Sequence, residues 1–475
     1  MDAGRYAAVS YRSMPHAAGD PDRLAVAARL HGLRAPDPET ARVLELGCGD
    51  GGNLLAIAAA RPRAELAGFD AEATAIERGQ ALAAAAGLER VALHAADLRE
   101  LSAADVGGAD YVVIHGLWSW VPDDVREAAL ALASAVIAES GVVSVSYNAL
   151  PGWHLWMAPR AIARRAAANV RDPEAATRAA LGALREAAHL HGADDLYGRM
   201  LAAAIQRLQS RPPELFFHDD LADECTAFSV SDVARRAADH GLRYLDEALP
   251  AQWWQARIAR GQAERIRAAS LDALERQQAA DLASGVDFKA TLFVPERSQP
   301  STEIDPLAAL DLSVAARHDA PPLPDGTAAA VRSLFEALAP ERSGRVFRPV
   351  REAAEEAGLG DRTAAGAVLR LVADGHARLA LTPPDVAAVP GAAPRASALA
   401  RAQVGQADRV ATLLHDVVTL DDSGARALLA LLDGSIEAID LQAVLARRHS
   451  ELASPQLGIA VETTLRRFAE VGLLA

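Results

Sequence analysis

The stretch ARVLELGCGDGGNLLAIAAARP, residues 41–62, constrains the fold more strongly than any other part of the chain. An apolar run at 42–47 predicts a buried strand, and a glycine-rich turn connects this strand directly to a helical pattern. Similar strand–helix units continue to residue 149, and such alternation predicts a parallel sheet with right-handed crossovers. The further strands are expected at 64–70, 91–97, 109–116 and 141–149, and helices at 72–88 and 122–140.

The glycine turn predicts a ligand site at the end of the first strand. Gly47, Gly49 and Gly52 have the spacing G-x-G-x-x-G, which lets the backbone approach a ligand and points a helix N-terminus at it. NAD sites share this spacing, but here Glu45 ends the strand and Asp50 lies inside the turn. An acid in the turn would repel a pyrophosphate, which binds to bare backbone N–H groups. A ligand with a positive centre and no phosphate fits better, and S-adenosylmethionine is such a ligand.

Two later acids lie where a nucleoside would need them. Asp70 closes the second strand, at the spacing where an acid accepts hydrogen bonds from both ribose hydroxyls. Asp97 ends the third strand and can accept from the exocyclic amine of adenine, with the backbone N–H of Leu98 close to the ring. Either acid alone could be a helix cap, but together with the turn they indicate S-adenosylmethionine and not NAD. We therefore expect cofactor contacts from Glu45, Gly47, Cys48, Gly49, Gly51, Asn53, Asp70, Asp97, Leu98 and His115.

The pattern changes after Asn148. Residues 153–211 have helical periodicity, and two further strands are expected at 242–248 and 288–294, with helical insertions around them. Residues 326–385 have the helix–helix–helix–strand order of a winged helix. The expected segments are a helical lead-in at 1–40, a core at 41–150, a helical middle domain at 151–228, the last sheet elements at 229–295, a linker at 296–325 and a mainly helical, winged-helix-like domain at 326–475, with a low-complexity connector at 385–405.

These features resemble the class I S-adenosylmethionine-dependent methyltransferases over roughly residues 41–149. Further motifs are similar to bacterial methyltransferases that carry a regulatory domain, and especially to the rickettsial protein lysine methyltransferases that act on outer-membrane proteins. The motifs are DPDRLAVAARLHGL (20–33), HGLWSWVP (115–122), SYNALPGW (146–153) and LLALLDGS (428–435). HGLWSWVP and SYNALPGW are much more specific than the glycine turn, and the resemblance covers nearly the whole chain.

The resemblance implies an α/β fold with a Rossmann-like, seven-stranded sheet that an antiparallel hairpin completes. It places the regulatory domain in the helical middle segment. It also implies S-adenosylmethionine as cofactor and S-adenosylhomocysteine as product. In the family the position of Trp118 is often Tyr, so a contact made by that hydroxyl would be absent here.

The acceptor site is expected past the fourth and fifth strands, because ligands bind at the carboxyl edge of open α/β sheets. Aromatic residues make up 4% of the chain, yet several fall in the segments IHGLWSW and SYNALPGWH. We expect an aromatic-walled channel for a narrow cationic side chain, with Asn148 or His115 accepting a hydrogen bond; alternatively, Trp120 and Trp153 pack the middle domain onto the sheet. His154 is expected at the surface. The candidate catalytic residues are His115, Trp118, Tyr147 and Asn148.

The expected reaction is methyl transfer to an amine, on a protein lysine or a peptide. The absence of an N-P-P-Y motif lowers the rank of amide and base acceptors. A small metabolite or natural product is the alternative acceptor. A more remote alternative is a DNA-binding regulator that senses the cofactor, but the candidate recognition helix carries only Arg362 and Arg370 as bases. The net charge of −15 also speaks against a nucleic-acid partner.

The cysteines and the apolar pattern indicate the compartment. Cys48 and Cys225 are too few for a disulfide framework or a structural zinc site, so a reducing compartment is expected and no metal. The sequence has no apolar stretch long enough to span a membrane and no signal-peptide pattern, which predicts a cytoplasmic protein. Homodimerisation stays open. Lys289 is the only lysine, which a composition rich in Ala and Arg explains without a functional reason.

Overall fold

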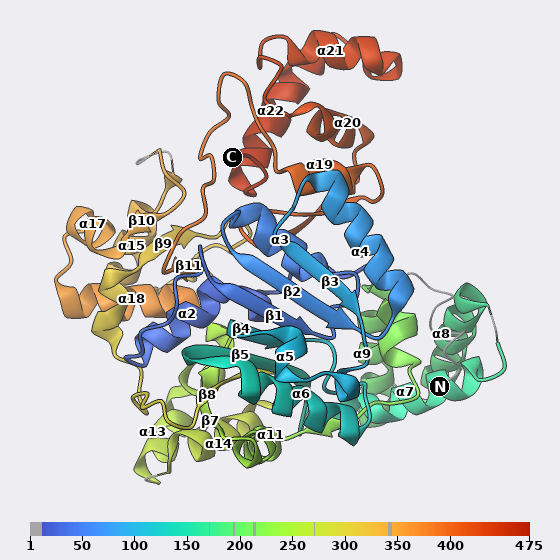
Figure 1. Ribbon diagram of the computed structural model, residues 1–475, viewed down its shortest axis with the longest axis vertical. Coiled ribbons are helices and arrows are strands. Elements are labelled where there is room, and N and C mark those ends of the chain that lie inside the picture. Colours follow the sequence, from blue (N-terminus) through green and yellow to red (C-terminus); the bar gives the residue numbers. More distant parts are fainter. Residues whose placement is uncertain (1–11, 171, 193–194, 212–214, 270, 341–343) are drawn as a thin grey trace.

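An eight-stranded sheet forms the centre of the computed structural model, which describes residues 12–170, 172–192, 195–211, 215–269, 271–340 and 344–475 (Figure 1). The strand order is β3-β2-β1-β4-β5-β8-β7, and the short β6 pairs with the end of β5. The first five strands are parallel, whereas β8 is antiparallel to both β5 and β7. The bounds are β1 Arg42–Leu46, β2 Glu65–Asp70, β3 Val91–Ala95, β4 Ala109–Ile114, β5 Ile137–Ala149, β6 Ala227–Phe228, β7 Leu242–Glu247 and β8 Phe288–Pro295. The predicted class I sheet with its closing hairpin is confirmed.

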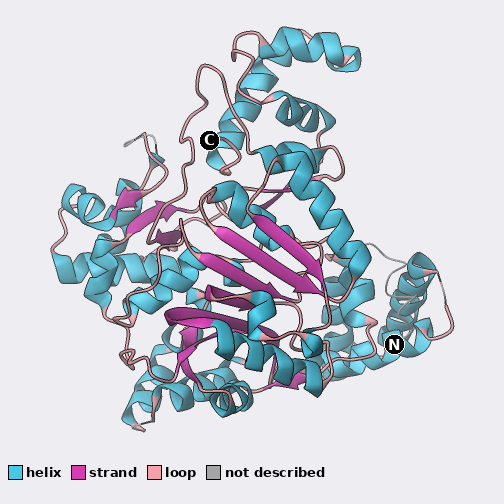
Figure 2. Cartoon of the chain, in the orientation of Figure 1, coloured by secondary structure: helices cyan, strands magenta, loops and turns pink. Residues whose placement is uncertain are grey.

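Helices cover both faces of this sheet, as the near-continuous apolar strands require (Figure 2). Leu44 and Val112 face α6 and α11, while Val43 and Val113 face α2, α3 and α4. Successive residues of one strand therefore contribute to separate cores. The bounds are α2 Pro21–Leu30, α3 Gly52–Ala60, α4 Ala73–Ala86, α5 Ala103–Val106, α6 Asp123–Val136 and α11 Val230–Asp239, with the short 3-10 turns η1 Ala17–Gly19 and η2 Leu98–Glu100.

Helix α6 is amphipathic and shorter than the sequence pattern predicts. Asp123 and Asp124 occupy its first turn, where carboxylates interact favourably with the free backbone N–H groups. The helix ends at Val136, and not at residue 140 as expected, because the chain already extends as β5 from Ile137. The strand β5 is therefore longer than predicted.

Three helices form the middle domain and lie beside the carboxyl ends of the parallel strands (Figure 1). Leu184, Leu201 and Phe216 belong to their common core. The helices are α7 His154–Ala167, α8 Pro173–His189 and α9 Leu196–Gln209, and a single π-helical turn, η3 Phe216–Asp220, follows them.

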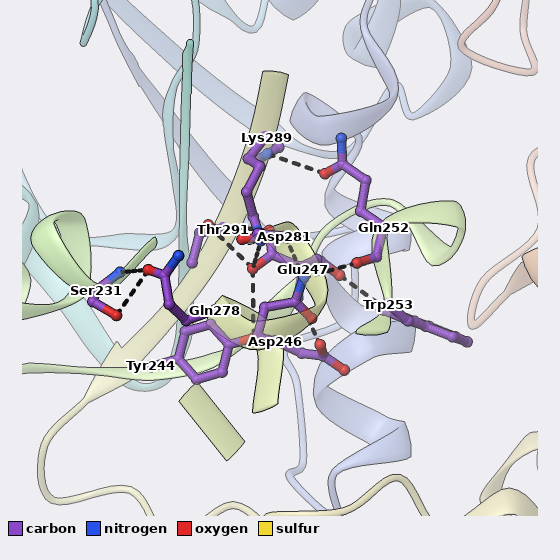
Figure 3. Close-up of polar contacts among 12 residues, drawn as sticks. Ser231, Tyr244, Asp246, Glu247, Gln252, Trp253, Gln278, Asp281, Lys289 and Thr291 are labelled. Atoms are coloured by element: carbon purple, nitrogen blue, oxygen red, sulfur yellow. Dashed lines mark hydrogen bonds and ion pairs between the residues drawn. The ribbon is translucent and has the colours of Figure 1, made fainter. Parts of the chain in front are cut away.

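A second helical insertion separates β7 from β8 and encloses a buried cluster of charged side chains. Lys289, on β8, points toward two carboxylates: its Nζ lies 2.6 Å from Asp281 Oδ2 and 3.1 Å from Glu247 Oε1 (Figure 3). Gln277 donates to Asp281 Oδ1 at 3.0 Å, and Thr291 donates to Glu247 Oε2 at 3.1 Å. The cluster thus ties the closing hairpin of the sheet to the insertion, whose helices are η4 Pro250–Gln252, α12 Trp254–Arg257, α13 Arg260–Ala268 and α14 Ala273–Ser284.

The segment predicted as a linker, 296–325, carries a strand. β9 is the middle strand of a three-stranded sheet with order β10-β9-β11, so the linker prediction is wrong. The pattern at 296–306 is indeed Pro- and Ser-rich, but the apolar run after it is too short to distinguish from a loop. The helix–helix–helix–strand order expected from residue 326 is present. The elements are η5 Pro306–Asp311, β9 Ser313–Ala316, α15 Ala329–Ala337, β10 Arg348–Pro349, α17 Val350–Glu356, α18 Asp361–Ala373 and β11 Ala377–Ala380.

The rest of the chain forms a second C-terminal unit with its own core, so residues 326–475 are not one domain. Part of the expected connector is the helix α19, where Leu399 packs with Leu55 and Ala83 on the helices of the sheet. The bounds are α19 Ala398–Val404, β12 Arg409–Ala411, β13 Val417–Thr419, α20 Ser423–Leu431, α21 Leu441–Arg448, η6 Ser450–Leu452 and α22 Leu457–Glu470. Of the predicted lead-in at 1–40, residues 1–11 lie outside the described part of the chain.

Candidate active site

A cavity of about 500 Å³ lies at the carboxyl ends of the parallel strands, below the middle domain. This is the edge of an open α/β sheet at which ligands bind. Its lining comes from the N-terminal segment, the glycine turn, the ends of β2, β4 and β5, and the middle domain. The lining residues include Ser13, Met14, His16, Glu45, Gly47, Cys48, Gly49, Asn53, Asp70, Glu72, His115, Gly116, Trp120, Asn148, Trp153, Arg207, Arg211, Leu215, His218, Asp219 and Phe288.

The glycine turn is held from outside by the N-terminal segment. Ser13 donates its backbone N–H to Asp50 Oδ1 at 3.0 Å and also contacts that oxygen through its hydroxyl. The Ser13 hydroxyl accepts from the backbone N–H of Gly52 at 2.8 Å. A Cβ atom on Gly52 would lie 1.9 Å from the carbonyl oxygen of Ser13, so this position requires glycine. Asp50 therefore anchors the N-terminal segment and does not itself line the cavity.

Glu45 is a buried carboxylate that faces the cavity. Its side chain is buried, Asn53 Nδ2 donates to Oε2 at 3.2 Å, and His16 Nε2 lies 3.6 Å from Oε1. Burial raises the pKa of Glu45 to about 8, and the negative charges of Asp70 and Asp50 add to this rise. A buried carboxylate in this state is stabilised by a bound cation and destabilised by a bound phosphate. The site thus fits an ammonium group.

Two stacked histidines lie beside Glu45. The rings of His16 and His115 are 3.2 Å apart between centroids, and Phe288 contacts His115 edge-on at 6.1 Å. Burial lowers the pKa of His115 to about 3 and the pKa of His16 well below its usual value, so both rings are neutral. Within the described residues, both ring nitrogens of His16 and Nδ1 of His115 are buried without a hydrogen-bond partner. Buried polar atoms of this kind are suited to a bound ligand.

Asp70 faces the cavity and also accepts hydrogen bonds from the backbone. Its carboxylate accepts from the N–H of Gly49 at 2.8 Å and from the N–H of Glu72 at 2.9 Å, so it fixes the glycine turn against the end of β2. Two oxygens with four lone-pair sites leave room for further donors such as ribose hydroxyls. The ribose role of Asp70 stays a prediction.

Other expected cofactor residues lie outside the cavity lining. Asp97 is half-exposed and pairs with Arg99, whose Nη2 lies 2.6 Å from Asp97 Oδ2. Leu98 is buried in the core below the sheet. Gly51 caps the start of α3 with a φ of 73° and faces Leu93. An ion pair, core packing and a capping position are the roles that the structure shows for these residues, and their cofactor contacts stay predictions.

Asn148 and Tyr147 lie on opposite faces of β5. Asn148 lines the cavity, and its backbone N–H donates to Ser119 Oγ at 2.8 Å, which fixes the end of the strand. Tyr147 is fully buried on the other side, with its hydroxyl 2.8 Å from Thr291 Oγ1. Alternation along a strand makes this separation unavoidable. Tyr147 was expected at the acceptor site, and that expectation is wrong.

Trp118 is also a core residue. It is completely buried and packs edge-on against Phe228 at 6.1 Å between ring centroids. Its carbonyl oxygen accepts from Arg126 Nε at 2.7 Å. The expected catalytic role of Trp118 is therefore wrong, whereas Trp120, two residues later, lines the cavity.

Trp120 and Trp153 combine the two roles that the sequence left open. Both line the cavity, and their rings meet edge to face at 6.4 Å. Arg207, from α9, lies 5.6 Å from the ring of Trp153 and pairs with Asp287 at 2.6 Å, so the middle domain is also attached at this point. His154 is exposed, as expected.

Sequence reasoning missed the N-terminal and middle-domain parts of the site. Ser13 and His16 precede the first strand, and Arg207 and Asp219 lie in helical sequence with no motif. The aromatic and acidic residues near the middle domain were a weak indication of a site. Their spacing in the sequence could not show that they lie at the carboxyl edge of the sheet. The part of the chain that the structure describes contains no cluster of three or more possible metal ligands. No helix in that part has the length and apolar character needed to cross a bilayer.

Comparisons with known families identify three parts of the chain. Residues 43–141 match a methyltransferase domain, residues 212–295 match a predicted methyltransferase regulatory domain, and residues 393–470 match a PKMT C-terminal winged helix domain. The regulatory match runs from residue 212 to the end of β8, so it overlaps the segment 151–228, where the sequence analysis placed the regulatory domain, only at 212–228. The winged-helix match covers the last unit of the chain and not the segment 326–385, where the sequence predicted that order of elements.

The curated relatives come from bacteria and carry no assigned function. One uncharacterised protein of Rickettsia prowazekii is 28% identical over 295 residues, which is 62% of this chain and 53% of that protein. A second is 36% identical over 135 residues, 28% of this chain and 54% of that protein. The chain thus spans about half the length of the curated relatives it matches.

The solved structure of PKMT2 from Rickettsia typhi has the same fold along the whole chain. Its complex with AdoHcy superposes with a TM-score of 0.86, and a second structure of the same protein superposes with 0.84. Each is 22% identical, with 98% of this chain and 100% of that chain covered. The resemblance to methyltransferases with a regulatory domain is therefore confirmed for the domains and for the fold.

Proposed function

We propose that this chain, which is built as a class I methyltransferase with a regulatory domain, transfers a methyl group from S-adenosylmethionine to the side-chain amine of a protein lysine. One observation carries the proposal: a single cavity joins a buried carboxylate, Glu45, to an aromatic end that contains Asn148, Trp120 and Trp153. The first end suits a cationic methyl donor, and the second suits a cationic acceptor. That the matched Rickettsia typhi protein is a PKMT supports a protein as the substrate.

The residues at the glycine turn would hold the methyl donor. Glu45 would pair with its ammonium group, and Asp70 would accept hydrogen bonds from its ribose hydroxyls. Gly47 and Gly49 let the backbone approach the ligand, since both have a positive φ (80° and 57°). The neutral rings of His16 and His115 close the site without adding a positive charge. When bound, the donor supplies a methyl carbon that its sulfonium already activates for displacement.

Asn148 and the tryptophans would position the acceptor. Aromatic rings bind an ammonium group and release it readily once it has lost its proton, and an amine reacts only in that neutral form. The amide oxygen of Asn148 can accept a hydrogen bond from the amine and so direct the nitrogen lone pair along the line of displacement. Alignment and exclusion of water, with no strong base, are the protein's main contributions to such a transfer.

The protein acceptor is tested with labelled cofactor. The full chain is incubated with tritiated S-adenosylmethionine and bacterial extract, and acid hydrolysates of the labelled proteins are analysed for methyl-lysine. We expect label in methyl-lysine. The enzyme's own band should stay unlabelled, because Lys289, its only lysine, is fully buried. Label found only in the low-mass fraction would replace the protein acceptor by a small metabolite.

Affinity for S-adenosylhomocysteine is expected to rise with pH. Because the pKa of Glu45 is raised to about 8, this carboxyl carries a proton at neutral pH in the free protein. A bound ammonium group favours the ionised carboxylate, so binding releases a proton and strengthens as pH rises. The dissociation constant is expected to fall by up to about tenfold per pH unit between about pH 6 and 7.5, below the range in which the ligand's α-amino group titrates.

Titration calorimetry in buffers with different ionisation enthalpies measures this proton release. Glu45→Gln removes the titrating group and should abolish the pH dependence. His16 and His115 stay neutral over this range because burial lowers their pKa values. If the dependence persists in Glu45→Gln, another group such as Asp70, whose pKa burial also raises, is responsible, and Glu45 does not hold the ammonium group.

We include in the proposal a reducing, cytoplasmic compartment, because Cys48 and Cys225 are both free thiols. Mass spectrometry of the protein purified from its own cells, with thiols alkylated at lysis, checks whether both thiols are reduced.

Size-exclusion chromatography with light scattering distinguishes the monomer from the homodimer, which the sequence left open.

A further inference from the structure

One residue of the C-terminal unit reaches the cavity region from the far end of the sequence. His415 lies between β12 and β13, and its Nε2 is 2.9 Å from Asn53 Oδ1, a separation of 362 residues along the chain. Both side chains are buried. Asn53 belongs to the first turn of α3 and lines the cavity next to the glycine turn.

The backbone of His415 is in an unfavourable conformation that its surroundings impose. Its φ of 59° is the one positive value at a non-glycine residue in the described part of the chain. Such a conformation persists where neighbouring contacts fix it, and it is concentrated at functional sites. Here Thr412 Oγ1 accepts from the N–H groups of Leu414 and Asp416, each at 3.2 Å, and Leu413 donates to the carbonyl of Gly472 at 2.8 Å.

The turn is also attached to the neighbouring C-terminal unit. Arg378, on β11, donates to the carbonyl oxygen of Leu414 at 2.8 Å and forms an ion pair with Asp416. Both of these residues flank His415. The backbone that carries the imidazole is therefore fixed on both sides of His415.

The contact fixes the orientation of the Asn53 amide. Asn53 Oδ1 accepts from His415 and faces the backbone N–H of His16 at 3.4 Å, so the oxygen lies on the side of two donors. The amide nitrogen is then directed to Glu45 Oε2 at 3.2 Å. Burial lowers the pKa of His415, which keeps the ring neutral with one N–H to donate.

We infer that His415 is a positioning residue for the methyl-donor site: it orients Asn53, which in turn holds Glu45, so the C-terminal winged-helix unit completes that site. The inference rests on the proposed function, because it takes this cavity to be the place where the methyl donor binds. It gives the C-terminal unit a role in binding the cofactor that the methyltransferase domain cannot perform alone.

Calorimetric titration of the full chain with S-adenosylhomocysteine tests the inference. His415→Ala and His415→Gly are expected to raise the dissociation constant about tenfold, the effect of one lost buried hydrogen bond. Glycine adopts a positive φ without strain, so the His415→Gly variant stays folded even if the alanine variant does not. His415→Gln keeps an N–H donor and should restore most of the affinity. Val417→Ala, in the same hairpin, is the matched control and should bind as the wild type does.

Two further measurements separate positioning from a merely structural role. The KM for S-adenosylmethionine should rise in His415→Gly while the KM for the acceptor stays unchanged. In an Asn53→Ala background, His415→Gly should add no further loss, because its effect passes through Asn53. The inference is overturned if His415→Ala and His415→Gly bind S-adenosylhomocysteine as tightly as the wild type does. It is also overturned if Val417→Ala and His415→Gln lose as much affinity as these two variants. If the wild type itself does not bind, the proposed function fails and not this inference alone.

Discussion

Replacing Lys289 by methionine is expected to lower the free energy of unfolding by about 3–5 kcal/mol, the range for removing one partner of a buried ion pair. The side chains of Lys289, Asp281 and Glu247 are all fully buried. Methionine fills a similar volume but leaves the two carboxylates without their cation. The midpoint of urea unfolding, followed by tryptophan fluorescence, measures the loss.

The loss should also depend on pH. The pKa of Glu247 is raised to about 8, chiefly by burial, while Lys289 opposes the rise and the charges of Asp281 and Asp246 contribute to it. A carboxyl group with a higher pKa in the folded state than in the unfolded state binds protons more strongly when folded, so falling pH favours the folded state. Without Lys289 this shift increases. The variant is therefore expected to lose more stability at about pH 8.5 than at about pH 6.

Two variants control for this interpretation. Lys289→Met combined with Asp281→Leu removes a carboxylate together with the cation and should recover most of the lost stability, because well-packed apolar residues replace buried ion pairs at little cost. Arg63→Met removes a cation from an exposed pair with Glu39 and should cost less than about 1 kcal/mol. A similarly small loss in Lys289→Met would contradict the role assigned to the buried cluster.

The sequence predicted the central sheet because its signals are local. The apolar runs of β1 and β4 and the glycine turn each depend on neighbouring residues. The closing hairpin could be placed as well, although helical insertions interrupt it, because the resemblance to class I methyltransferases supplied its position.

The C-terminal units could not be divided from the sequence for the opposite reason. β9 has four residues and gains its identity from pairing with β10 and β11, which are distant along the chain. Such short strands have no periodicity of their own. The helix α19 packs Leu399 against the helices of the sheet, a contact that no local pattern reveals.

The candidate site shows the same division. Glu45, Asp70 and Asn148 end strands, so the sequence could place them at one edge of the sheet. Tyr147 was assigned to that edge too, since adjacent residues were not separated by face. His415 had no local signal at all, because its relevance depends on the docking of a unit that begins more than three hundred residues after the glycine turn.

Asn148→Leu is expected to lower kcat about a hundredfold, the scale of losing alignment of a reacting group. Leucine has nearly the shape of asparagine but cannot accept a hydrogen bond from the acceptor amine. The dissociation constant for S-adenosylhomocysteine should change by less than about threefold, since the loss concerns alignment in the transition state and not binding of the cofactor. Steady-state rates with the acceptor protein measure kcat, and calorimetry measures the dissociation constant.

The neighbouring residue provides the control, because Tyr147 and Asn148 are adjacent on β5 and lie on opposite faces of it. Tyr147→Phe removes the hydroxyl contact with Thr291 behind the sheet. It should therefore lower stability by about 1 kcal/mol, the value of one buried hydrogen bond, and leave kcat nearly unchanged. An unchanged kcat in Asn148→Leu, or a large fall in Tyr147→Phe, would move the acceptor site away from the cavity face of β5. The pair thus locates the chemistry on one side of a single strand.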